Sequence, residues 1–465
     1  MGDKLMTNPA PLIMSDALPT ADPDALAASA PLKAQRRTAM LLMLAFIYSL
    51  NYLDRQIVVI LQEPIKADFQ LADWELGLLT GGAFGIFYTL MGIPIAQLID
   101  RGVNRVRLIA VFTASWSVMT ALCGLTRSFG AFFTARMGVG LAEAGFAPAA
   151  HSLISDLYPP RERPAAAGIF AIGVPVGIMA GLSIGGIVAQ ATDWRTALLL
   201  AGAPGILIAI LFPLIAREPI RGGTEDPSDQ PAEATQFLSF LQSLRVLSQR
   251  RAFLHIVAGT AIMAFAQTGI STWLPSFLIR NHGMSLAHVG VGLGLLTGIC
   301  GAIGTWAGGW QGTRLAKSGL HMALWLPIAG MLLCIPLDII ALSMADGQAV
   351  LLVLIPSYIV GSFWTAPSIA LTQSLAPVSM RARASAVNIV AANLIGVSMG
   401  PLVAGVLSDA FAYLRGGDAA LGLRDAMICL TAFFLWAAWH WTMAMRALKQ
   451  ESTTTVRIDC TAQRL

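Results

Sequence analysis

Apolar residues fill most of the sequence in long runs, separated by short polar or charged stretches. In windows of about 19 residues, twelve runs of roughly 20 to 28 residues stand out, bounded by charge, Pro or Gly clusters. They lie near 38–62, 75–98, 106–126, 130–157, 165–190, 195–216, 253–279, 286–310, 319–343, 348–376, 385–411 and 424–447. A helix of this length crosses a bilayer and satisfies its own backbone hydrogen bonds. Since the polar alternation of barrel strands is missing, the pattern predicts twelve transmembrane helices.

The composition and the placement of charge support a membrane protein. Hydrophobic residues make up 56% of the 465 residues and charged residues only 12%, against roughly a quarter charged in an ordinary soluble domain. Most of the 30 Lys and Arg residues fall in loops and tails on one predicted side. This bias predicts a multi-pass protein of the inner (plasma) membrane with both termini cytoplasmic. The net charge of +4 therefore reflects orientation, and we expect no nucleic-acid partner.

Two short motifs recur at nearly the same spacing, which predicts a duplicated six-helix unit. "GLLTG" occurs at 77–81 and 294–298, and "RERPAAAG" from Arg161 aligns with "RARASAVN" from Arg381. Such repeats are typical of transporters in which two halves move around a midplane site. The predicted domains are a cytoplasmic tail, a six-helix bundle, a cytoplasmic linker, a second six-helix bundle and a cytoplasmic tail, over residues 1–37, 38–216, 217–251, 252–447 and 448–465.

The linker is predicted to end in an amphipathic helix along the membrane surface. In "QFLSFLQSLRVLSQRR" the apolar residues that share one helical face are Phe237, Phe240, Leu241, Leu244 and Leu247. A plain connector is the alternative.

Four ionisable residues stand inside predicted helices, where an unpaired charge costs several kcal/mol. They are Asp54, Arg55, Arg136 and Glu143; His151 is a weaker candidate. Helical spacing puts Arg136 and Glu143 on one face of their helix. The four residues are also predicted to lie at similar depths in the membrane, so we expect all four to share one cavity. We expect Asp54 and Glu143 to be the titrating acids, and Arg55 and Arg136 to be released when an acid takes a proton. A permanent buried ion-pair lock is the alternative.

The second half offers no comparable pair in its predicted helices. Four aromatic residues, Phe265, Trp273, Phe363 and Trp364, predict an apolar wall opposite the charges, which would suit a small amphipathic substrate. Ordinary helix packing is the alternative for each aromatic. The candidate substrate-binding or charge-partner residues are Arg55, Arg136, Tyr52, His151, Trp273 and Trp364.

With two such halves, the loop "GIPIAQLIDRGVNRVRL" resembles the major facilitator superfamily. The run "NYLDR" with "ARMGVGLAEAGFAPAAHSLISDLYPPRERPAAAGIF" is similar to its spinster subfamily of lipid transporters, and "NYLDR" weakly resembles organic-anion:proton symporters. The resemblance implies an all-α major facilitator fold and proton-coupled alternating-access transport of lysolipid-like, sphingoid-like or other amphipathic molecules. An organic-anion (sugar-acid-like) symporter is the alternative, with Arg55 and Arg136 gripping a carboxylate.

The resemblance also implies a cytoplasmic gate of Asp100, Arg101 and Arg105 that locks the outward-open state. The loop departs from the family pattern at Ala96, Val103 and Asn104, and in the second half Thr313 takes the Asp position. Asp338 lies in the ninth helix, which is peripheral in this fold. In the fifth helix the glycines recur every fourth residue, a spacing that favours close helix packing and resembles an exporter motif: Gly173, Gly177, Gly181 and Gly185.

Several chemistries lack their sequence signatures. No Gly-Lys dipeptide is present for a P-loop, the histidines show no zinc spacing, and "GLSIG" lies in an apolar helix rather than a strand-to-helix turn. We therefore expect no catalytic residue, no metal and no cofactor, with the proton gradient as the energy source. We expect a monomer among membrane lipids. A polytopic membrane enzyme acting on lipids and a passive channel are the alternatives from other classes.

Overall fold

The computed structural model describes residues 34–224, 240–377 and 380–462, and these ranges contain helices and no β-strand. Ten helical segments within them are long and apolar enough to cross a membrane, and a bent pair, α2 and α3, makes an eleventh. The fourth predicted run is divided between α7 and α8, each shorter than a full span. Every run predicted from the sequence therefore falls on a helix or on consecutive helices, and the all-helical prediction is confirmed.

The first half begins at the first described residue and ends before the linker. Its elements are α2 (Ala34–Ile60), α3 (Gln62–Phe69), α4 (Asp73–Gly77), η1 (Leu78–Gly82), α5 (Ala83–Asp100), α6 (Arg105–Leu125), α7 (Phe129–Glu143), α8 (Phe146–Leu157), α9 (Arg163–Ala171), α10 (Gly173–Ala191) and α11 (Trp194–Ile215).

The second half follows the linker helix α12 (Phe240–Ser248). Its elements are α13 (Arg251–His282), α14 (Leu286–Leu295), η3 (Leu296–Cys300), α15 (Gly301–Ala316), η4 (Leu320–Leu324), α16 (Trp325–Ser343), α17 (Gly347–Gly361), α18 (Thr365–Ser374), α19 (Arg381–Ala391), η6 (Ala392–Val397), α20 (Ser398–Leu414) and α21 (Ala419–Ala462).

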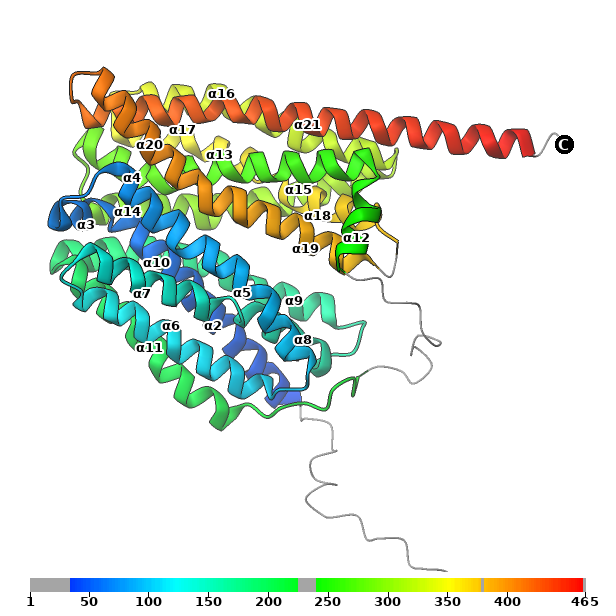
Figure 1. The fold of residues 1–465 in the computed structure, drawn as a ribbon, viewed down its shortest axis with the longest axis horizontal. Coiled ribbons are helices and arrows are strands. Elements are labelled where there is room, and N and C mark those ends of the chain that lie inside the picture. The colour runs from blue at the N-terminus through cyan, green and yellow to red at the C-terminus, as the bar shows by residue number, and fades with distance from the viewer. Residues whose placement is uncertain (1–33, 225–239, 378–379, 463–465) are drawn as a thin grey trace, which may run out of the picture.

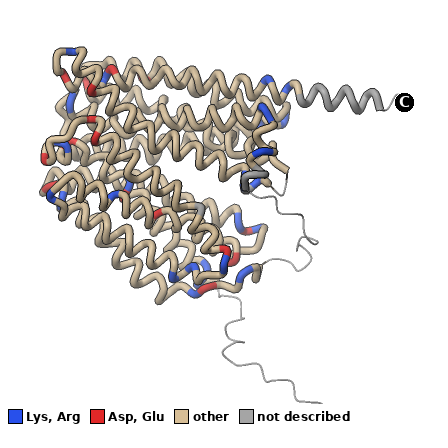
Figure 2. Tube along the Cα trace, in the orientation of Figure 1, with Lys and Arg blue, Asp and Glu red and all other residues tan. Residues whose placement is uncertain are grey.

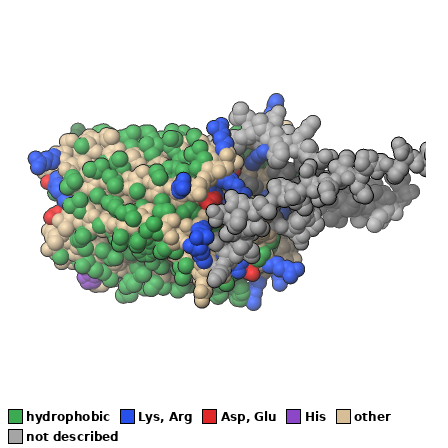
Figure 3. Space-filling view, turned by 90° about the horizontal axis from the view of Figure 1, so that it is seen from below, with side chains coloured by type: hydrophobic (Ala, Val, Ile, Leu, Met, Phe, Trp, Pro, Cys, Tyr) green, Lys and Arg blue, Asp and Glu red, His purple; other side chains and the backbone are tan. Residues whose placement is uncertain are grey.

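The two halves lie side by side and diverge toward one end (Figure 1). We call the end that carries α3 and α4, where the halves meet, the closed end. The opposite end, where α12 lies and α2 begins, is the open end. Charged residues gather near these two ends (Figure 2), and hydrophobic side chains cover most of the face between them (Figure 3). Such an apolar belt is the surface that a membrane-spanning bundle presents to lipid.

Glycines allow the halves to touch through their backbones toward the closed end. A Cβ on Gly77 would lie 2.4 Å from the carbonyl oxygen of Pro401, and one on Gly290 would lie 2.3 Å from that of Leu182. The first contact joins the α4–η1 segment to α20, and the second joins α14 to α10. These are equivalent pairs in the two halves, and both copies of "GLLTG" continue into a π-helical turn, η1 and η3. The repeat predicted from the sequence thus recurs as a structural repeat.

The glycine stripe of α10 has a different neighbour. A Cβ on Gly173, Gly177 or Gly181 would lie within 2.7 Å of a backbone oxygen of α2, in the same half. The stripe therefore brings α10 against the helix that carries Asp54 and Arg55.

Polar side chains mark where several helices begin. Asn104, Ser128, Asp193 and Ser285 each accept a hydrogen bond from a backbone N–H in the first turn of the helix that follows. Asp193 also accepts from the hydroxyl of Thr196, and these hydrogen bonds hold the pKa of its carboxyl below the usual range. Asn104 is one of the residues that depart from the family loop pattern, and in this chain it caps α6.

The linker and the C-terminal tail are described in part. A helix is found at Phe240–Ser248, where Leu247 is buried, whereas Phe237 lies outside the described residues. Its position on a membrane surface stays a prediction. The helix α21 continues past the predicted end of the last span at residue 447 without a break.

Candidate functional site

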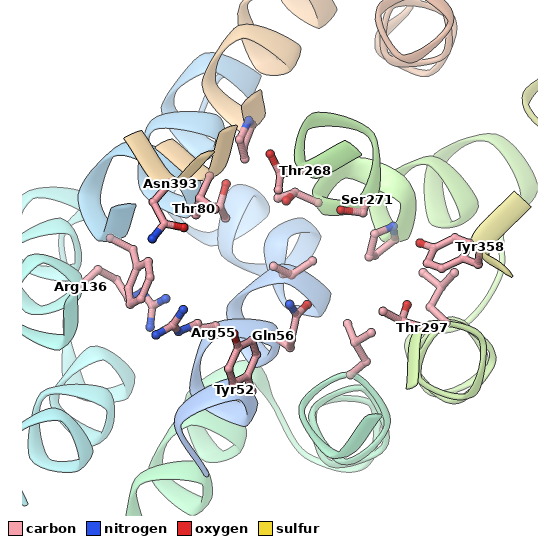
Figure 4. Close-up of a pocket in the computed structure, with 18 residues that line it drawn as sticks. Tyr52, Arg55, Gln56, Thr80, Arg136, Thr268, Ser271, Thr297, Tyr358 and Asn393 are labelled. Atoms are coloured by element: carbon pink, nitrogen blue, oxygen red, sulfur yellow. The ribbon is translucent and has the colours of Figure 1, made fainter. Parts of the chain in front are cut away.

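A cavity of about 260 Å³ lies between the halves and receives side chains from both. We call it the central cavity. Figure 4 shows Arg55 and Arg136 of the first half on one side of it, and Ser271, Thr297 and Tyr358 of the second half on the other. The remaining labelled lining residues are Tyr52, Gln56, Thr80, Thr268 and Asn393.

Arg55 is held in place by one acid, one amide and three aromatic rings. Its Nε donates to Oε2 of Glu143 at 2.8 Å, and its Nη2 donates to Oδ1 of Asn51, one helical turn earlier, at 3.0 Å. Its guanidinium carbon lies 4.9, 4.6 and 4.5 Å from the ring centres of Tyr52, Phe84 and Tyr88. A guanidinium in this position gains both ion-pair and cation–π stabilisation.

Arg136 has far fewer partners, although it is 2% exposed. Its Nη1 donates to the backbone oxygen of Asp54 over 3.4 Å, its Nε has no hydrogen-bond partner, and no acid of the described chain lies within ion-pair distance. The guanidinium lines the central cavity. Nη2, for which no hydrogen bond is described, is therefore the donor available to a molecule in that space.

The two acids lie behind the arginines. Asp54 and Glu143 are 2% and 1% exposed, and neither lines the central cavity. Oδ2 of Asp54 accepts from the hydroxyl of Thr120 at 2.6 Å, while Oδ1 of Asp54 and Oε1 of Glu143 have no hydrogen-bond partner among the described residues.

The predicted arrangement of these four charges around one cavity is corrected in two respects. Of the four charged residues, only Arg55 and Arg136 reach the cavity wall. An Arg55–Glu143 pair forms, but Asp54 pairs with a threonine hydroxyl and meets Arg136 through its backbone oxygen. Adjacent residues on a helix point about 100° apart, so Asp54 turns into the bundle when Arg55 turns to the cavity.

The predicted aromatic wall of the second half is also corrected. Trp273 is fully buried and donates to the backbone oxygen of Pro401, and Trp364 donates to the side chain of Gln267. Neither indole lines the central cavity; hydroxyl groups from α13, η3 and α17 and the amide of Asn393 take that place. His151 is exposed, contacts the ring of Phe170 and lies off the cavity wall. Tyr52 does line the cavity.

A second cavity of about 240 Å³ adjoins the first on the side of the second half. We call it the side cavity. Gln56, Thr268, Ser271, Thr297 and Tyr358 line both spaces. Its other walls are mostly apolar, but they also contain the polar side chains of Gln267, Asp338, Ser357 and Ser362; the apolar residues are Ile178, Met263, Ile270, Leu274, Leu354 and Phe434. The two spaces together offer a cationic side and an apolar side.

The predicted cytoplasmic gate residues do not interact with one another. Arg105 is buried in the first half, where it pairs with Asp156 at 2.5 Å and Glu218 at 2.6 Å. The side chains of Asp100 and Arg101 are exposed and have no described hydrogen bond or ion pair. A lock at the open end requires the halves to meet there, so the gate stays a prediction for another conformation.

The closed end carries an ionic cluster that the sequence reasoning missed. Asp73 is buried and pairs with Lys66 of its own half and with Arg280 of the other, 2.7 Å away. Arg280 also pairs with Glu63 at 2.8 Å, and Asp73 accepts from the hydroxyl of Ser408. We call these five residues the closed-end latch. Three of its members lie in one stretch near helix ends, where charge is expected, whereas Arg280 and Ser408 lie hundreds of positions further along the chain. No local sequence pattern therefore reveals the contacts between the halves.

Comparisons with known proteins agree with this architecture. The family model of the Major Facilitator Superfamily matches residues 44–401. The chain belongs to the major facilitator superfamily. An MFS-type efflux pump of Mycolicibacterium smegmatis is 35% identical over 408 residues, which cover 87% of this chain and 93% of that protein. Human protein spinster homolog 1 is 28% identical over 392 residues, 80% of this chain and 73% of the relative.

A solved structure indicates the subfamily to which the chain belongs. A bacterial homolog of the human lysosomal transporter spinster, in an inward-facing and unoccupied conformation, superimposes with a TM-score of 0.82 at 29% identity, over 90% of this chain and 99% of that chain. The spinster-like resemblance seen in the sequence is therefore confirmed. Because the superfamily consists of transporters, this chain is a membrane transporter of small substrates rather than an enzyme.

Proposed function

We propose that this major facilitator protein is a proton-coupled transporter whose central cavity binds the anionic group of an amphipathic molecule. We assign both termini to the cytoplasm of a plasma membrane, because basic loops favour the cytoplasmic side. The open end then faces inward, as in the inward-facing bacterial homolog.

The observation that carries the proposal is the state of Arg136. A buried guanidinium with one long hydrogen bond is costly unless something else satisfies it. A phosphate or carboxylate in the central cavity would do so and could accept from Arg55 as well, because both guanidiniums line the same space. The rest of an amphipathic molecule could extend into the apolar side cavity.

Proton coupling follows from competition for Arg55. When Glu143 is ionised it holds Arg55 at 2.8 Å. A proton on Glu143 removes that attraction and frees the guanidinium for the substrate anion, so proton and anion bind together. When the proton leaves, the ion pair re-forms and the anion loses a partner. Asp54 lies next to Arg136 and is the second candidate for protonation.

A second candidate function is symport of a compact organic anion, such as a sugar acid. The hydroxyl-rich wall of the second half favours it, because several donors and acceptors would match a polyhydroxylated ligand. Competition separates the two. A lysolipid displaces the bound substrate if that substrate is an amphiphile. A sugar acid displaces it if the substrate is a compact organic anion.

The test is transport by the purified protein in liposomes under an imposed pH gradient. We expect the parent to accumulate lysophosphatidylglycerol, a stable monoanion. We expect Arg136→Gln to lose its binding of this lipid. Glu143→Gln and Asp54→Asn should bind without accumulating. Parent-like, gradient-driven accumulation by both acid variants would overturn the coupling assignment. Binding that is unchanged in Arg136→Gln would overturn the anion site.

A further inference from the structure

Asp338 is a buried carboxylate that the transport scheme above does not use. It lies on α16 in the second half and is 6% exposed. A carboxylate at such a depth costs several kcal/mol unless it is paired, so its presence calls for a function.

Among the residues that the structure describes, Asp338 has one hydrogen-bond partner and no ion-pair partner. The hydroxyl of Ser357 on α17 donates to its Oδ1 at 2.5 Å. Ion pairs of the described residues include the buried acids Glu143 and Asp73, but not Asp338. Asp338 thus differs from these two acids, and resembles Asp54, in having only a hydroxyl as its hydrogen-bond partner.

Asp338 also borders a space that a ligand could enter. Together with Cys334, one turn earlier on α16, and Ser357, it lines the side cavity. That cavity shares Ser271, Thr297 and Tyr358 with the central cavity, on the side away from Arg55 and Arg136. A molecule that spans both spaces would meet guanidinium groups at one end and a carboxylate at the other.

We propose that Asp338 and Ser357 form a second recognition point, which binds a protonated amine at the end of the substrate remote from its anionic group. This deepens the proposed function and rests on it, because the anionic end is placed at Arg55 and Arg136. The substrate class becomes a dipolar amphiphile, with an apolar chain between an anion and an ammonium. The ammonium would donate to the carboxylate and to the hydroxyl oxygen, and these contacts would offset the burial of the charge.

Two synthetic probes test the proposal: dodecyl methyl phosphate and its ω-amino derivative, together with shorter and longer chains. Affinities are measured on the full-length protein in nanodiscs. We expect the best amino probe to bind about ten-fold tighter than its plain counterpart, the gain typical of a hydrogen bond to a charged group. In Asp338→Asn this gain should disappear while the plain probe binds as before. The control Asp346→Asn, at an exposed helix cap, should keep the gain.

The outcomes separate the two proposals. Equal affinity of plain and amino probes at every chain length would overturn the amine site and leave the anion site standing. Plain probes that do not bind, or that bind Arg136→Gln equally well, would overturn the proposed function itself. If sodium tightens the plain probe in the parent but not in Asp338→Asn, the carboxylate binds a metal cation, which also overturns the amine site.

A second readout does not depend on the folding of an Asp338 variant. Cys334 lines the same cavity, so a protein that keeps it as its sole cysteine reports on occupancy. We expect the amino probe to slow modification of Cys334 by a methanethiosulfonate reagent several-fold more than the plain probe does at equal anion-site occupancy. Equal protection by the two probes would contradict the proposal.

Discussion

The Arg55–Glu143 pair beside the central cavity and the closed-end latch both rely on ion pairs with arginine, but in different places. Both contain buried carboxylates held by arginine, with Glu143 on Arg55 and Asp73 on Arg280. The central pair lies wholly within the first half and its arginine faces a cavity. The latch joins the two halves, so it must break whenever the closed end opens.

The difference separates two tasks. Changing the charge of Glu143 alters what the cavity can bind without directly releasing one half from the other. Breaking the Asp73–Arg280 pair weakens the contact between the halves without changing the cavity wall. The two sites are linked by one piece of chain, since α2 carries Arg55 and α3 carries Glu63 and Lys66 after a bend of 55°. We therefore expect a change at the cavity to reach the latch through this bent helix pair.

Removing the central acid should have the largest effect on transport. In Glu143→Gln the side chain cannot exchange a proton, so gradient-driven accumulation of lysophosphatidylglycerol should fall by about ten-fold or more, which corresponds to at least 1.4 kcal/mol. Downhill exchange should continue. Liposome uptake with and without a pH gradient measures both. The matched control is Glu162→Gln, at an exposed acid of the open end, and an equal loss there would contradict the assignment.

Removing the latch acid should shift conformation rather than coupling. Asp73→Asn leaves Arg280 with one acid instead of two, and breaking a buried pair costs about 3–5 kcal/mol. We expect the closed end to open in a substantial fraction of molecules. Spin labels at Ala67→Cys and Tyr413→Cys, on exposed positions of the two halves, report this as a longer distance.

The control for the latch is Asp425→Asn. Asp425 pairs with Arg415 and Arg424 of its own half, so its loss should leave the label distance unchanged. If Asp73→Asn also leaves the distance unchanged, the latch does not hold the closed end.

A smaller effect is expected where the halves touch through glycine. In Gly290→Ala the new methyl would lie 2.3 Å from the carbonyl oxygen of Leu182, so α10 and α14 must separate, and overpacking of this kind costs about 1–3 kcal/mol. The same spin labels should report partial opening. Gly168→Ala meets nothing within 4 Å and should behave like the parent. Identical label distances in the two glycine variants would exclude a backbone contact as part of the closure.

The smallest effect is expected at the open end. Asn104 caps α6 by accepting from the backbone N–H of Arg107 at 2.8 Å, and loss of such a cap costs about 1 kcal/mol. Asn104→Ala should unfold at slightly lower temperature, with unaltered label distances and unaltered accumulation. Asn104→Ser, which can still cap, should restore stability. A change in coupling would assign the loop a role beyond capping.

The sequence predicted the parts of this molecule that follow from length and local pattern. Apolar runs of bilayer length gave the helices, and the cost of charge in lipid singled out Arg55 and Glu143, which the structure pairs. Pairings that depend on tertiary distance were beyond such reasoning. Asp73 and Ser408 are hundreds of positions apart in the chain yet share a hydrogen bond, and nothing in their local sequence marks them.

Side-chain direction was the other limit. Aromatic residues such as Trp273 suit a cavity wall and a helix contact equally well, and the structure places this indole against Pro401. The ninth helix is peripheral in this fold, yet the burial of Asp338 beside the side cavity makes this residue a candidate site. The position of a residue along its helix could be predicted from the sequence, whereas the direction of its side chain around the helix axis required the packed structure.

The most direct measurement of the central claim is proton uptake when the purified protein binds lysophosphatidylglycerol in weakly buffered solution. This ligand does not titrate near neutral pH, so any proton taken up belongs to the protein. The account predicts uptake by the parent and its loss in Glu143→Gln while binding persists. Binding without proton uptake in the parent, or equal uptake by parent and variant, would contradict it.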